Sequence, residues 1–329
     1  MNGNITANHS DIIIIGAGMA GLSCAGMLVD AGLSVRVLDK GRGPGGRMAA
    51  RRAEIAGETV SFDHGAQFFS ARDAGFQAAV AKWQAHGAVA PWPAAGEEAW
   101  VGTPGMNGPI KAMSGEVEVQ WGTRVLTIAR GEGGWHVDTG EDSFTAATLL
   151  VAVPAEQAGE LLAPIAPDLA AIPASIVSEP CWAVMAGFEQ RLDVKPDAIR
   201  DPDARISWAA RNSAKPERAG TETWVLHASP ERSREIIDIP KEEVAKLLLT
   251  DFFAQIGKRV QSPIHLTAHR WLYAQPIKHA GGQPGKHAHF DAEARIGIAG
   301  DYLHSPRVEG AWISGAALAR QVLAAPPAP

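Results

Sequence analysis

The N-terminal part of the chain alternates apolar runs with polar and glycine-rich segments in the order of a β–α–β unit. The β-branched run Ile12–Ile15 stands between Asp11 and a glycine-rich turn, and such a run predicts a strand buried on both faces of a parallel sheet. The segment Met19–Asp30 is predicted to be a helix, and Val35–Leu38 the second parallel strand. These elements indicate an α/β domain of the Rossmann type.

Three glycines join the first strand to the helix in the sequence G-A-G-M-A-G. Gly16 would permit the tight turn, Gly18 would let backbone N–H groups approach a pyrophosphate, and Gly21 would let the helix pack close to the strand. Asp39 closes the second strand, where a carboxylate accepts the ribose hydroxyls of an adenosine. The alternative is a tight turn in an unrelated α/β domain, but strand, helix and carboxylate together favour a dinucleotide site.

A second glycine cluster follows in R-G-P-G-G-R, from Arg42 to Arg47. It resembles the R-x-G-G-R element of flavoproteins of the amine-oxidase type, which have two dinucleotide-binding domains. The resemblance implies that the cofactor is FAD, that both arginines neutralise its diphosphate, and that Gly45 and Gly46 bring the backbone near the flavin. The alternative is a flexible basic loop.

The segment F-D-H-G-A-Q-F-F (62–69) follows a predicted hairpin over 53–61. It resembles a loop of the flavin amine-oxidase superfamily that passes beside the isoalloxazine ring, which implies that Gln67 contacts the flavin or the substrate. His64 could attach a flavin covalently, but a histidine beside an aspartate is more typical of a hydrogen-bonded loop. We therefore expect non-covalent FAD.

The remaining patterns complete a discontinuous FAD domain and outline a second domain. Helices are expected over 74–87 and 241–256 and from about 308, with a loop crossing between domains over 91–108. Strands are expected over 117–119, 125–128, 135–137, 149–153, 182–188, 206–210, 223–227, 265–271 and 295–299. The order predicts an FAD domain of 11–75, 108–158 and 291–326, a substrate domain of 76–107 and 159–290 with a mixed α+β sheet, and a disordered tail of 1–10.

Composition narrows the function classes. The 329 residues carry a net charge of −6, which argues against a nucleic-acid partner. The absence of a signal-peptide pattern and of a long apolar run predicts a cytoplasmic protein without membrane contact. Cys24 and Cys181 are predicted to be structural, and His279, His287 and His289 to lie in a solvated loop without metal. The sequence makes no prediction of oligomeric state.

Over nearly its whole length, about 11–323, the chain resembles the bacterial branch of the renalase family. The motifs are D-K-G-R-G-P-G-G-R-M, F-D-H-G-A-Q-F-F-S-A-R-D, W-A-A-R-N-S-A-K-P-E-R, T-W-V-L-H-A, H-R-W-L-Y-A and G-D-Y-L-H-S-P-R-V-E-G-A-W-I-S-G-A-A-L-A. The resemblance implies oxidation of 2- and 6-dihydro isomers of NAD(P)H to NAD(P)+, with electrons passing through FAD to O2 to give hydrogen peroxide. Direct hydride transfer to flavin N5 would require no general base.

The resemblance also assigns site residues. The predicted catalytic residues, which would shape the substrate site, are Gln67, Trp182, Trp271, Tyr273 and Arg307. The predicted FAD-binding residues are Gly16, Gly18, Met19, Ala20, Gly21, Asp39, Lys40, Arg42, Gly46, Arg47, His64, Gly65, Ala66, Gln67, Val125, Gly300, Asp301, Val308, Glu309, Gly310 and Ala311. The tryptophans at 182, 208, 224 and 271 could sandwich a nicotinamide ring or form ordinary core, and His269 could pair with a substrate phosphate or carboxamide or make a structural hydrogen bond.

Two other functions remain open at this stage. A flavin amine oxidase uses the same scaffold, but many such enzymes carry a lysine near flavin N5, and the corresponding segment 181–188 has none. The substrate domain also lacks an evident acidic cluster that would recruit an ammonium group. The third possibility is an FAD-binding redox module without turnover.

Overall fold

The computed structural model describes residues 8–218, 220–277 and 286–326, which form two compact units. The first unit consists of residues 1–46, 110–178 and 276–329, and the second of 47–109 and 179–275. Among the described residues, no helix is both long enough and apolar enough to cross a membrane.

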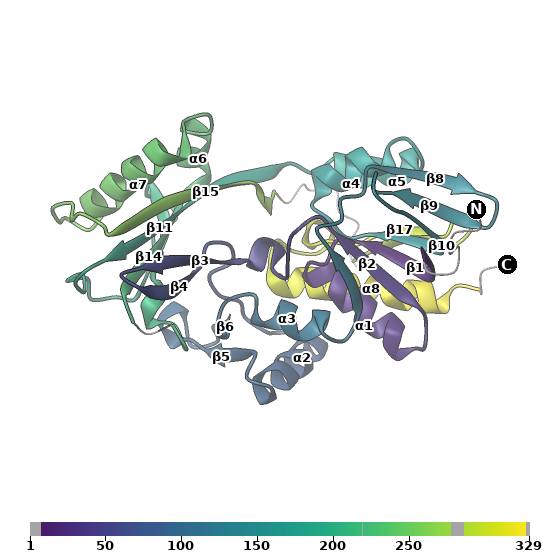
Figure 1. The fold of residues 1–329 in the computed structure, drawn as a ribbon, viewed down its shortest axis with the longest axis horizontal. Helices are drawn as coiled ribbons and strands as arrows, with labels where there is room; N and C mark the ends of the chain where they lie inside the picture. The colour runs from purple at the N-terminus through teal and green to yellow at the C-terminus, as the bar shows by residue number, and fades with distance from the viewer. Residues whose placement is uncertain (1–7, 219, 278–285, 327–329) are drawn as a thin grey trace. The chain divides into compact units, whose positions relative to one another are not determined.

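A parallel sheet forms the centre of the first unit (Figure 1). Its parallel strands are β7, β2, β1, β10 and β17 in spatial order. The antiparallel strand β16 extends one edge, and β8 and β9 pair antiparallel beside β10. The bounds are β1 His9–Ile15, β2 Val35–Asp39, β7 Glu118–Trp121, β8 Thr127–Gly131, β9 Gly134–Asp138, β10 Ser143–Val151, β16 His289–Asp291 and β17 Ile296–Ile298.

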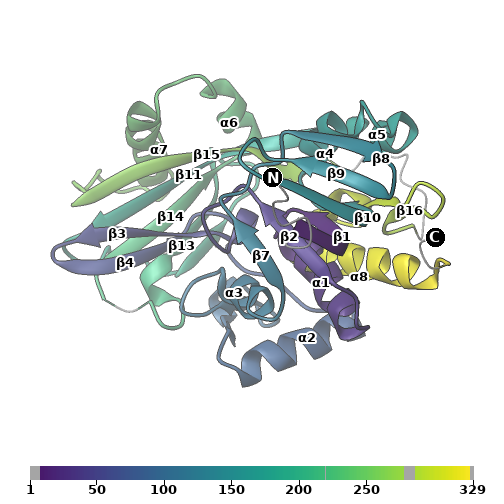
Figure 2. The ribbon, with the colours of Figure 1, turned by 45° about the vertical axis from the view of Figure 1, so that its right-hand side comes forward.

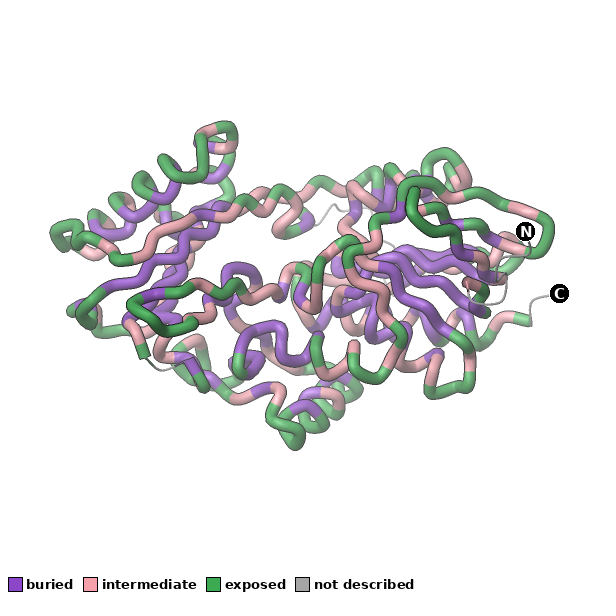
Figure 3. The backbone as a smooth tube through the Cα atoms, in the orientation of Figure 1, coloured by how far each residue is buried: buried purple, intermediate pink, exposed green. Residues whose placement is uncertain are grey.

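Helices cover both faces of this sheet. Ile13 and Ile15 pack in a core cluster with residues of α4 and α5, whereas Ile12 and Ile14 point to the opposite face because side chains alternate along a strand. On that opposite face lie α1 and α8 (Figures 1 and 2), and the strands between the helix layers are buried (Figure 3). The bounds are α1 Met19–Asp30, α3 Gly108–Ser114, α4 Ala155–Leu162, α5 Pro167–Ala174 and α8 Val308–Ala324, with short 3₁₀ turns η2 Gly46–Met48 and η5 Asp301–Leu303.

The second unit contains a five-stranded sheet in the order β12, β13, β14, β11, β15. Its β12–β13, β13–β14 and β11–β14 pairs are antiparallel. Residues of α7 pack with one face of this sheet in a hydrophobic core, and two hairpins, β3–β4 and β5–β6, complete the unit. The bounds are β3 Ala50–Ile55, β4 Glu58–Asp63, α2 Ala74–Ala85, β5 Val89–Pro91, η3 Pro93–Ala95, β6 Trp100–Gly102, β11 Ser178–Phe188, β12 Ala198–Arg200, β13 Ile206–Arg211, η4 Asn212–Ala214, β14 Glu222–Ala228, α6 Pro230–Glu235, α7 Lys241–Gln255 and β15 His265–Pro276.

The fold class predicted from the sequence is confirmed, with three local corrections. Strand β1 begins at His9 and not at Ile12, so residues 9 and 10 belong to the sheet and not to a tail, while residues 1–7 lie outside the described part. The expected loop 91–108 contains β6, which pairs with β5. Strand β8 begins at Thr127, so Val125 lies before the strand expected to contain it.

The boundaries of the two compact units differ from those of the predicted domains. Residues 47–75, predicted to be part of the FAD domain, fall in the second unit, and residues 159–178, predicted to be part of the substrate domain, fall in the first. A compact unit is defined by packing and a functional domain by the ligand it binds. The predicted functional limits therefore stay a proposal.

Candidate functional site

In the first unit, the turn between β1 and α1 is built on two glycines. Gly16 has φ +107°, in the region that favours glycine, and a Cβ there would lie 2.5 Å from the carbonyl oxygen of Ala152. A Cβ on Gly21 would overlap the carbonyl oxygen of Gly16. The roles predicted for Gly16 and Gly21 thus have a steric basis, since only glycine lets the turn, the helix and the neighbouring strand approach this closely.

Asp39 fixes the same turn from the end of β2. Its carboxylate accepts hydrogen bonds from the backbone N–H groups of Ala17 and Gly41, each at 2.6 Å. The carbonyl of Asp39 in turn accepts the N–H of Thr123, at 2.8 Å, in the loop after β7. Because a carboxylate offers about four acceptor positions, Asp39 retains the capacity to accept ribose hydroxyls at this edge of the sheet.

The N-terminus of α1 is open toward the same edge. Gly18 is the N-cap and supplies no side-chain acceptor, and the first turn holds no acidic residue. A Cβ on Gly18 would meet no atom within 4 Å. The N–H groups of Gly18, Met19, Ala20 and Gly21 precede the first intrahelical bond, which runs from Leu22 to Gly18. N–H groups without an intrahelical acceptor at the positive end of a helix dipole suit a phosphate, so the residues present here fit the pyrophosphate of FAD.

The C-terminal segments return to the carboxyl end of the parallel strands. Gly300 and Asp301 follow β17, and the Gly300 N–H donates to the Ser314 hydroxyl of α8 at 2.9 Å. A Cβ on Gly310 would overlap the carbonyl of Ser305, so the loop before α8 folds against its first turn. Val308, Glu309, Gly310 and Ala311 form that turn, and Arg307, its N-cap, is exposed.

Four other predicted FAD-binding residues belong to the first unit, and one of them, Gly46, lies beside the glycine turn, since a Cβ there would be 3.9 Å from the Cα of Gly18. Lys40 donates to Gln157 of α4 at 2.8 Å. Arg42 and Gly46 are exposed. The side chain of Val125 packs in the hydrophobic core around β10, so only its backbone is available for the adenine contact predicted for it.

In the second unit, the predicted flavin loop is fastened to Arg47. The Ala66 N–H donates to the Arg47 carbonyl at 2.8 Å, and a Cβ on Gly65 would overlap that carbonyl. The guanidinium of Arg47 reaches the carbonyl of Ala274 at 3.5 Å. The structure thus brings together two motifs that are separate in the sequence, R-x-G-G-R and D-H-G-A-Q.

Behind this loop lies a buried ionic cluster, which we define as Asp63, Lys215 and Arg218. The carboxylate of Asp63 contacts the Lys215 Nζ at 3.0 Å and the Arg218 guanidinium at 2.8 Å. It also accepts the backbone N–H of Met106 at 2.8 Å. Burial alone would raise the pKa of Asp63, but the two cations lower it. Burial lowers the pKa of Lys215 to about 8, against the opposing effect of Asp63.

Gln67 joins the ionic cluster to the loop. Its amide nitrogen donates to the carbonyl oxygens of Asp63 and Gly65, the latter at 3.0 Å. Its amide oxygen accepts from Lys215 at 3.1 Å. Both polar ends of this buried side chain therefore have protein partners, a geometry that suits positioning of the loop.

His64, His269 and Trp271 form an aromatic cluster in front of the ionic cluster. The rings of His64 and Trp271 stack with centroids 5.2 Å apart, and His269 stands edge-on to both, at 4.9 Å from His64 and 4.5 Å from Trp271. The indole N–H of Trp271 donates to the His64 carbonyl at 2.8 Å. The Nδ1 of His64 is buried without a hydrogen-bond partner among the described residues, and a buried polar atom in that condition suits a ligand contact.

The histidines of this region are neutral at pH 7. Burial, followed by the charges of neighbouring groups that include His269 and Arg51, lowers the pKa of His64 to about 4. Burial and Lys215 lower the pKa of His227 to about 4. Burial and Arg51 also lower the pKa of His269. The region therefore holds neutral imidazoles beside a permanent cation.

We expect the protein to lose stability as the pH falls from about 6.5 to 4. Histidine in the unfolded chain has a pKa near 6.5, so in this window the unfolded state binds more protons than the folded state, and the linkage relation lowers the free energy of unfolding. For His64 alone, the free energy of unfolding falls by about 3 kcal/mol once the pH has dropped below the pKa of the folded state. The melting temperature measured across this pH range tests the expectation.

His64→Gln should flatten that pH dependence, since glutamine does not titrate. His86→Gln, which removes an exposed histidine of the same unit, is the matched control and should leave the pH dependence as in the parent protein. An equal flattening in both variants would contradict the assignment to His64.

The other predicted residues of the second unit are placed as follows. Trp182 is 3% exposed, its indole N–H donates to the Ile236 carbonyl at 3.2 Å, and it packs in the core beside α7. Trp224 is fully buried in the same core. Tyr273 is half-buried on β15, two residues beyond Trp271 and therefore on the same face of the strand.

Of the three candidate loop histidines, His279 lies outside the described residues, and no metal-binding group of three His, Cys, Asp or Glu side chains occurs within the described part.

Both cysteines are structural in their surroundings. Cys24 is fully buried in α1, and burial raises the pKa of its thiol well above the usual range. Burial raises the pKa of Cys181 to about 12. Neither thiol is activated as a thiolate nucleophile.

Sequence reasoning did not assign roles to the ionic cluster or to Arg51. Asp63 lies next to His64 in the motif F-D-H-G-A-Q-F-F, and its place in that motif was a signal that could have identified it as a site residue. Lys215 and Arg218 lie about 150 positions further along the chain, in the motif W-A-A-R-N-S-A-K-P-E-R, to whose residues no role was assigned. Only the tertiary structure brings them to Asp63.

Comparisons with known proteins agree with the cofactor site. The profile of the family described as flavin containing amine oxidoreductase matches residues 93–323, and that of an NAD(P)-binding Rossmann-like domain matches residues 14–82. Wild-type putrescine oxidase bound to putrescine is 15% identical, with a TM-score of 0.70 over 96% of this chain and 99% of that one. Cyclohexylamine oxidase from Brevibacterium oxydans IH-35A is 13% identical, with a TM-score of 0.66 over 95% and 98% of the two chains.

A third solved structure, assigned as a protoporphyrinogen oxidase from Exiguobacterium sp. 255-15, is 13% identical and has a TM-score of 0.69 over 96% of this chain and 99% of that one. At these identities the structural matches establish the fold alone. The family profile covers more than half of the chain, and the glycine turn, Asp39 and the open helix terminus fit the nucleotide. The chain therefore belongs to the flavin-containing amine oxidoreductases, and FAD is its cofactor.

Proposed function

We propose that this FAD-dependent oxidoreductase is an oxidase of the renalase type, which takes hydride from 2- or 6-dihydro isomers of NAD(P)H and passes the electrons to O2. The products are NAD(P)+ and H2O2. The observation that carries the proposal is the charge of the second unit. Beside its aromatic cluster, the cations Arg51, Lys215 and Arg218 outnumber the carboxylates of Asp63 and Asp238.

This charge balance discriminates between substrate classes. An ammonium substrate would approach an excess of positive charge, whereas a dinucleotide carries negative phosphates, and like charges repel strongly where water is excluded. Asp63 offers no counter-ion to an amine because two cations of the protein already contact its carboxylate. The site thus favours an anionic substrate.

The chemistry requires positioning and no base. Bound FAD supplies the hydride acceptor and the route to O2. A dihydropyridine carries no acidic proton that must be removed before hydride leaves. The stacked rings of His64 and Trp271, with the neutral His269 edge-on to both, provide flat surfaces for a planar ring. We propose that Gln67 acts as a positioning residue, holding Gly65 and the loop around it through its two amide ends.

A flavin amine oxidase is the second candidate, favoured by the family match and by the two amine oxidases among the similar structures. Two features of the chain count against it. The segment 181–188 of β11 contains no lysine, and the ionic cluster carries excess positive charge.

Anaerobic mixing of the FAD-loaded protein with candidate substrates tests the proposal. We expect the visible absorbance band of the oxidised flavin to bleach rapidly with 2- or 6-dihydro isomers of NAD(P)H. Admission of O2 should then restore it with one H2O2 per substrate. Bleaching by putrescine or cyclohexylamine alone would establish the amine oxidase instead, and no bleaching by either class would identify a redox module without turnover.

A further inference from the structure

A groove of about 520 Å³ lies in the second unit, at the edge strand β15. Its walls come from β3, β11, β15 and the segment leading into α7. The lining residues are Arg51, Trp182, Asp238, Ile239, Pro240, Lys241, Ala268, His269 and Arg270. This volume falls in the range of small-molecule sites.

The groove is cationic. Arg51, Lys241 and Arg270 line it together with one carboxylate, that of Asp238, and Lys241 also forms an exposed ion pair with Glu242 at 3.7 Å. Arg270 is held in place, because it donates to the Ile237 carbonyl at 2.7 Å and its guanidinium lies 5.8 Å from the centre of the Trp182 ring. The guanidinium of Arg51 has no ion-pair or hydrogen-bond partner among the residues that the structure describes. Its charge is therefore available to a ligand.

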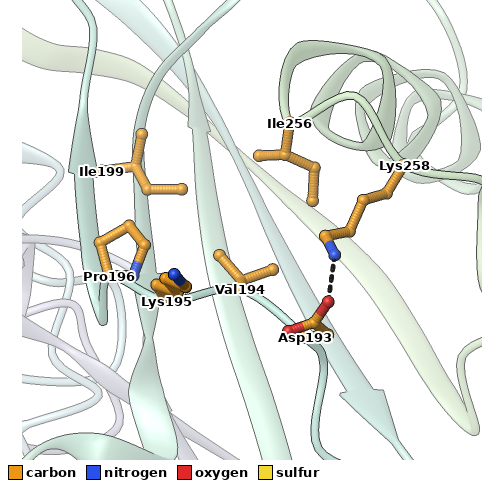
Figure 4. Close-up of a pocket in the computed structure, with 7 residues that line it drawn as sticks. All are labelled: Asp193, Val194, Lys195, Pro196, Ile199, Ile256 and Lys258. Carbon is orange, nitrogen blue, oxygen red and sulfur yellow. Dashed lines mark hydrogen bonds and ion pairs between the residues drawn. The ribbon is translucent and has the colours of Figure 1, made fainter.

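A second pocket in the same unit contains a lysine whose charge is balanced by a close ion pair (Figure 4). It has a volume of about 320 Å³, and its Lys258 forms an ion pair with Asp193 at 2.6 Å. Lys258 lies three residues beyond the last residue of α7, whereas Lys241 is the first. The two lysines thus flank one helix; Lys258 shares its pocket with Lys195, and Lys241 shares the groove with Arg51 and Arg270.

The groove is continuous with the aromatic cluster through His269. This residue lines the groove and stands 4.5 Å, ring centre to ring centre, from Trp271. The charge of Arg51 acts on both His64 and His269. A planar ring and an anionic group of one elongated molecule could therefore be bound side by side within this unit.

We propose that the groove binds the phosphates of the dinucleotide substrate, with Arg51 and Lys241 as phosphate-binding residues and Arg270 as the cation fixed at its wall. The inference rests on the proposed function, because it places the two ends of that substrate. Arginine and lysine side chains bind phosphate through charge-assisted hydrogen bonds, and phosphate recognition of this kind explains why three cations gather beside an aromatic surface.

Binding of ADP-ribose to the FAD-loaded protein, measured by isothermal titration calorimetry, tests the groove without turnover. We expect Arg51→Gln and Lys241→Gln each to raise the Kd by about tenfold, the loss of roughly one charge-assisted contact. The matched control Lys258→Gln removes a lysine at the other end of α7 and should leave the Kd unchanged. Inorganic phosphate serves as a second probe, and we expect it to bind at least tenfold more weakly than ADP-ribose.

The outcomes separate this inference from the proposed function. Equal Kd values in all four proteins, or an equal loss in the Lys258→Gln control, would overturn the groove even if dihydro isomers of NAD(P)H bleach the flavin. Equal affinity for ADP-ribose and inorganic phosphate would overturn a dinucleotide as the occupant. A loss of ADP-ribose affinity confined to the Arg51 and Lys241 variants supports phosphate binding in the groove. It does so even if dihydro isomers of NAD(P)H do not bleach the flavin.

Discussion

Replacing Asp63 by asparagine is expected to destabilise the protein by about 3–5 kcal/mol, because it leaves Lys215 and Arg218 buried without a counter-ion. The side chains of Asp63 and Lys215 are fully buried and that of Arg218 is 2% exposed, so water cannot replace the lost carboxylate. A loss of this size corresponds to a fall in melting temperature of roughly 5–10 °C. Thermal unfolding of the FAD-loaded protein measures it.

The double variant Asp63→Asn, Lys215→Met provides the internal test. Removing Lys215 together with its partner eliminates one unpaired buried charge, so the double variant should be more stable than Asp63→Asn alone, and the double-mutant cycle should show strong coupling. Asp193→Asn is the control, because it removes an exposed carboxylate from a surface pair with Lys258 and should leave the melting temperature nearly unchanged. Similar losses in Asp63→Asn and Asp193→Asn would contradict a special role for burial.

The β1–α1–β2 unit differs from the ionic cluster in how far its residues lie apart along the chain. The β1–α1–β2 unit was predictable because its signals are local: a β-branched run, three glycines at fixed spacing and a carboxylate at the end of the next strand all fall between Ile12 and Asp39. Each element is recognised from its own residues. The structure confirms their type and, within a few residues, their limits.

The start of β1 was missed for a physical reason. His9 and Asp11 are exposed while Ser10 is buried, so the polar part of the strand extends beyond the apolar run that marks its buried part. Its hydrogen bonding is nevertheless that of a strand, since His9 and Ser10 pair with Thr145 and Ala146 of β10. Hydrophobicity reports burial, and here the strand is longer than its buried segment.

The substrate side was less predictable because its residues come from distant segments. Arg51 belongs to a hairpin and Lys241 to a helix start, and no local pattern distinguishes them from ordinary surface residues, whereas His269 lies in the motif H-R-W-L-Y-A. Gln67 was recognised from its motif, but its internal hydrogen bonds to Gly65 and Lys215 depend on the tertiary fold. Motifs located the loop, and only the fold shows what holds it.

Replacing Gly21 by alanine is expected to abolish FAD binding. A Cβ at this position would overlap the carbonyl oxygen of Gly16 and come within 3.4 Å of the Cβ of Ala152. The Gly16 backbone cannot yield easily, since its N–H donates to Leu38 at 2.8 Å and the Asp39 carboxylate holds the next residue. Helix α1 must therefore move away from β1, which displaces the N–H groups that face the pyrophosphate. The FAD content of the purified protein, measured by absorbance, should fall at least about tenfold, which requires a loss of binding free energy of more than roughly 1.4 kcal/mol.

Gly26→Ala is the matched control within the same helix. A Cβ on Gly26 would meet no atom within 4 Å, and alanine in a helix interior is favoured over glycine by about 0.5–1 kcal/mol. This variant should keep its FAD and melt at the same or a slightly higher temperature. The same substitution thus removes the cofactor at one position of α1 and is harmless five residues later. If Gly21→Ala retained its FAD, close packing of α1 against β1 would not be what positions the phosphate site.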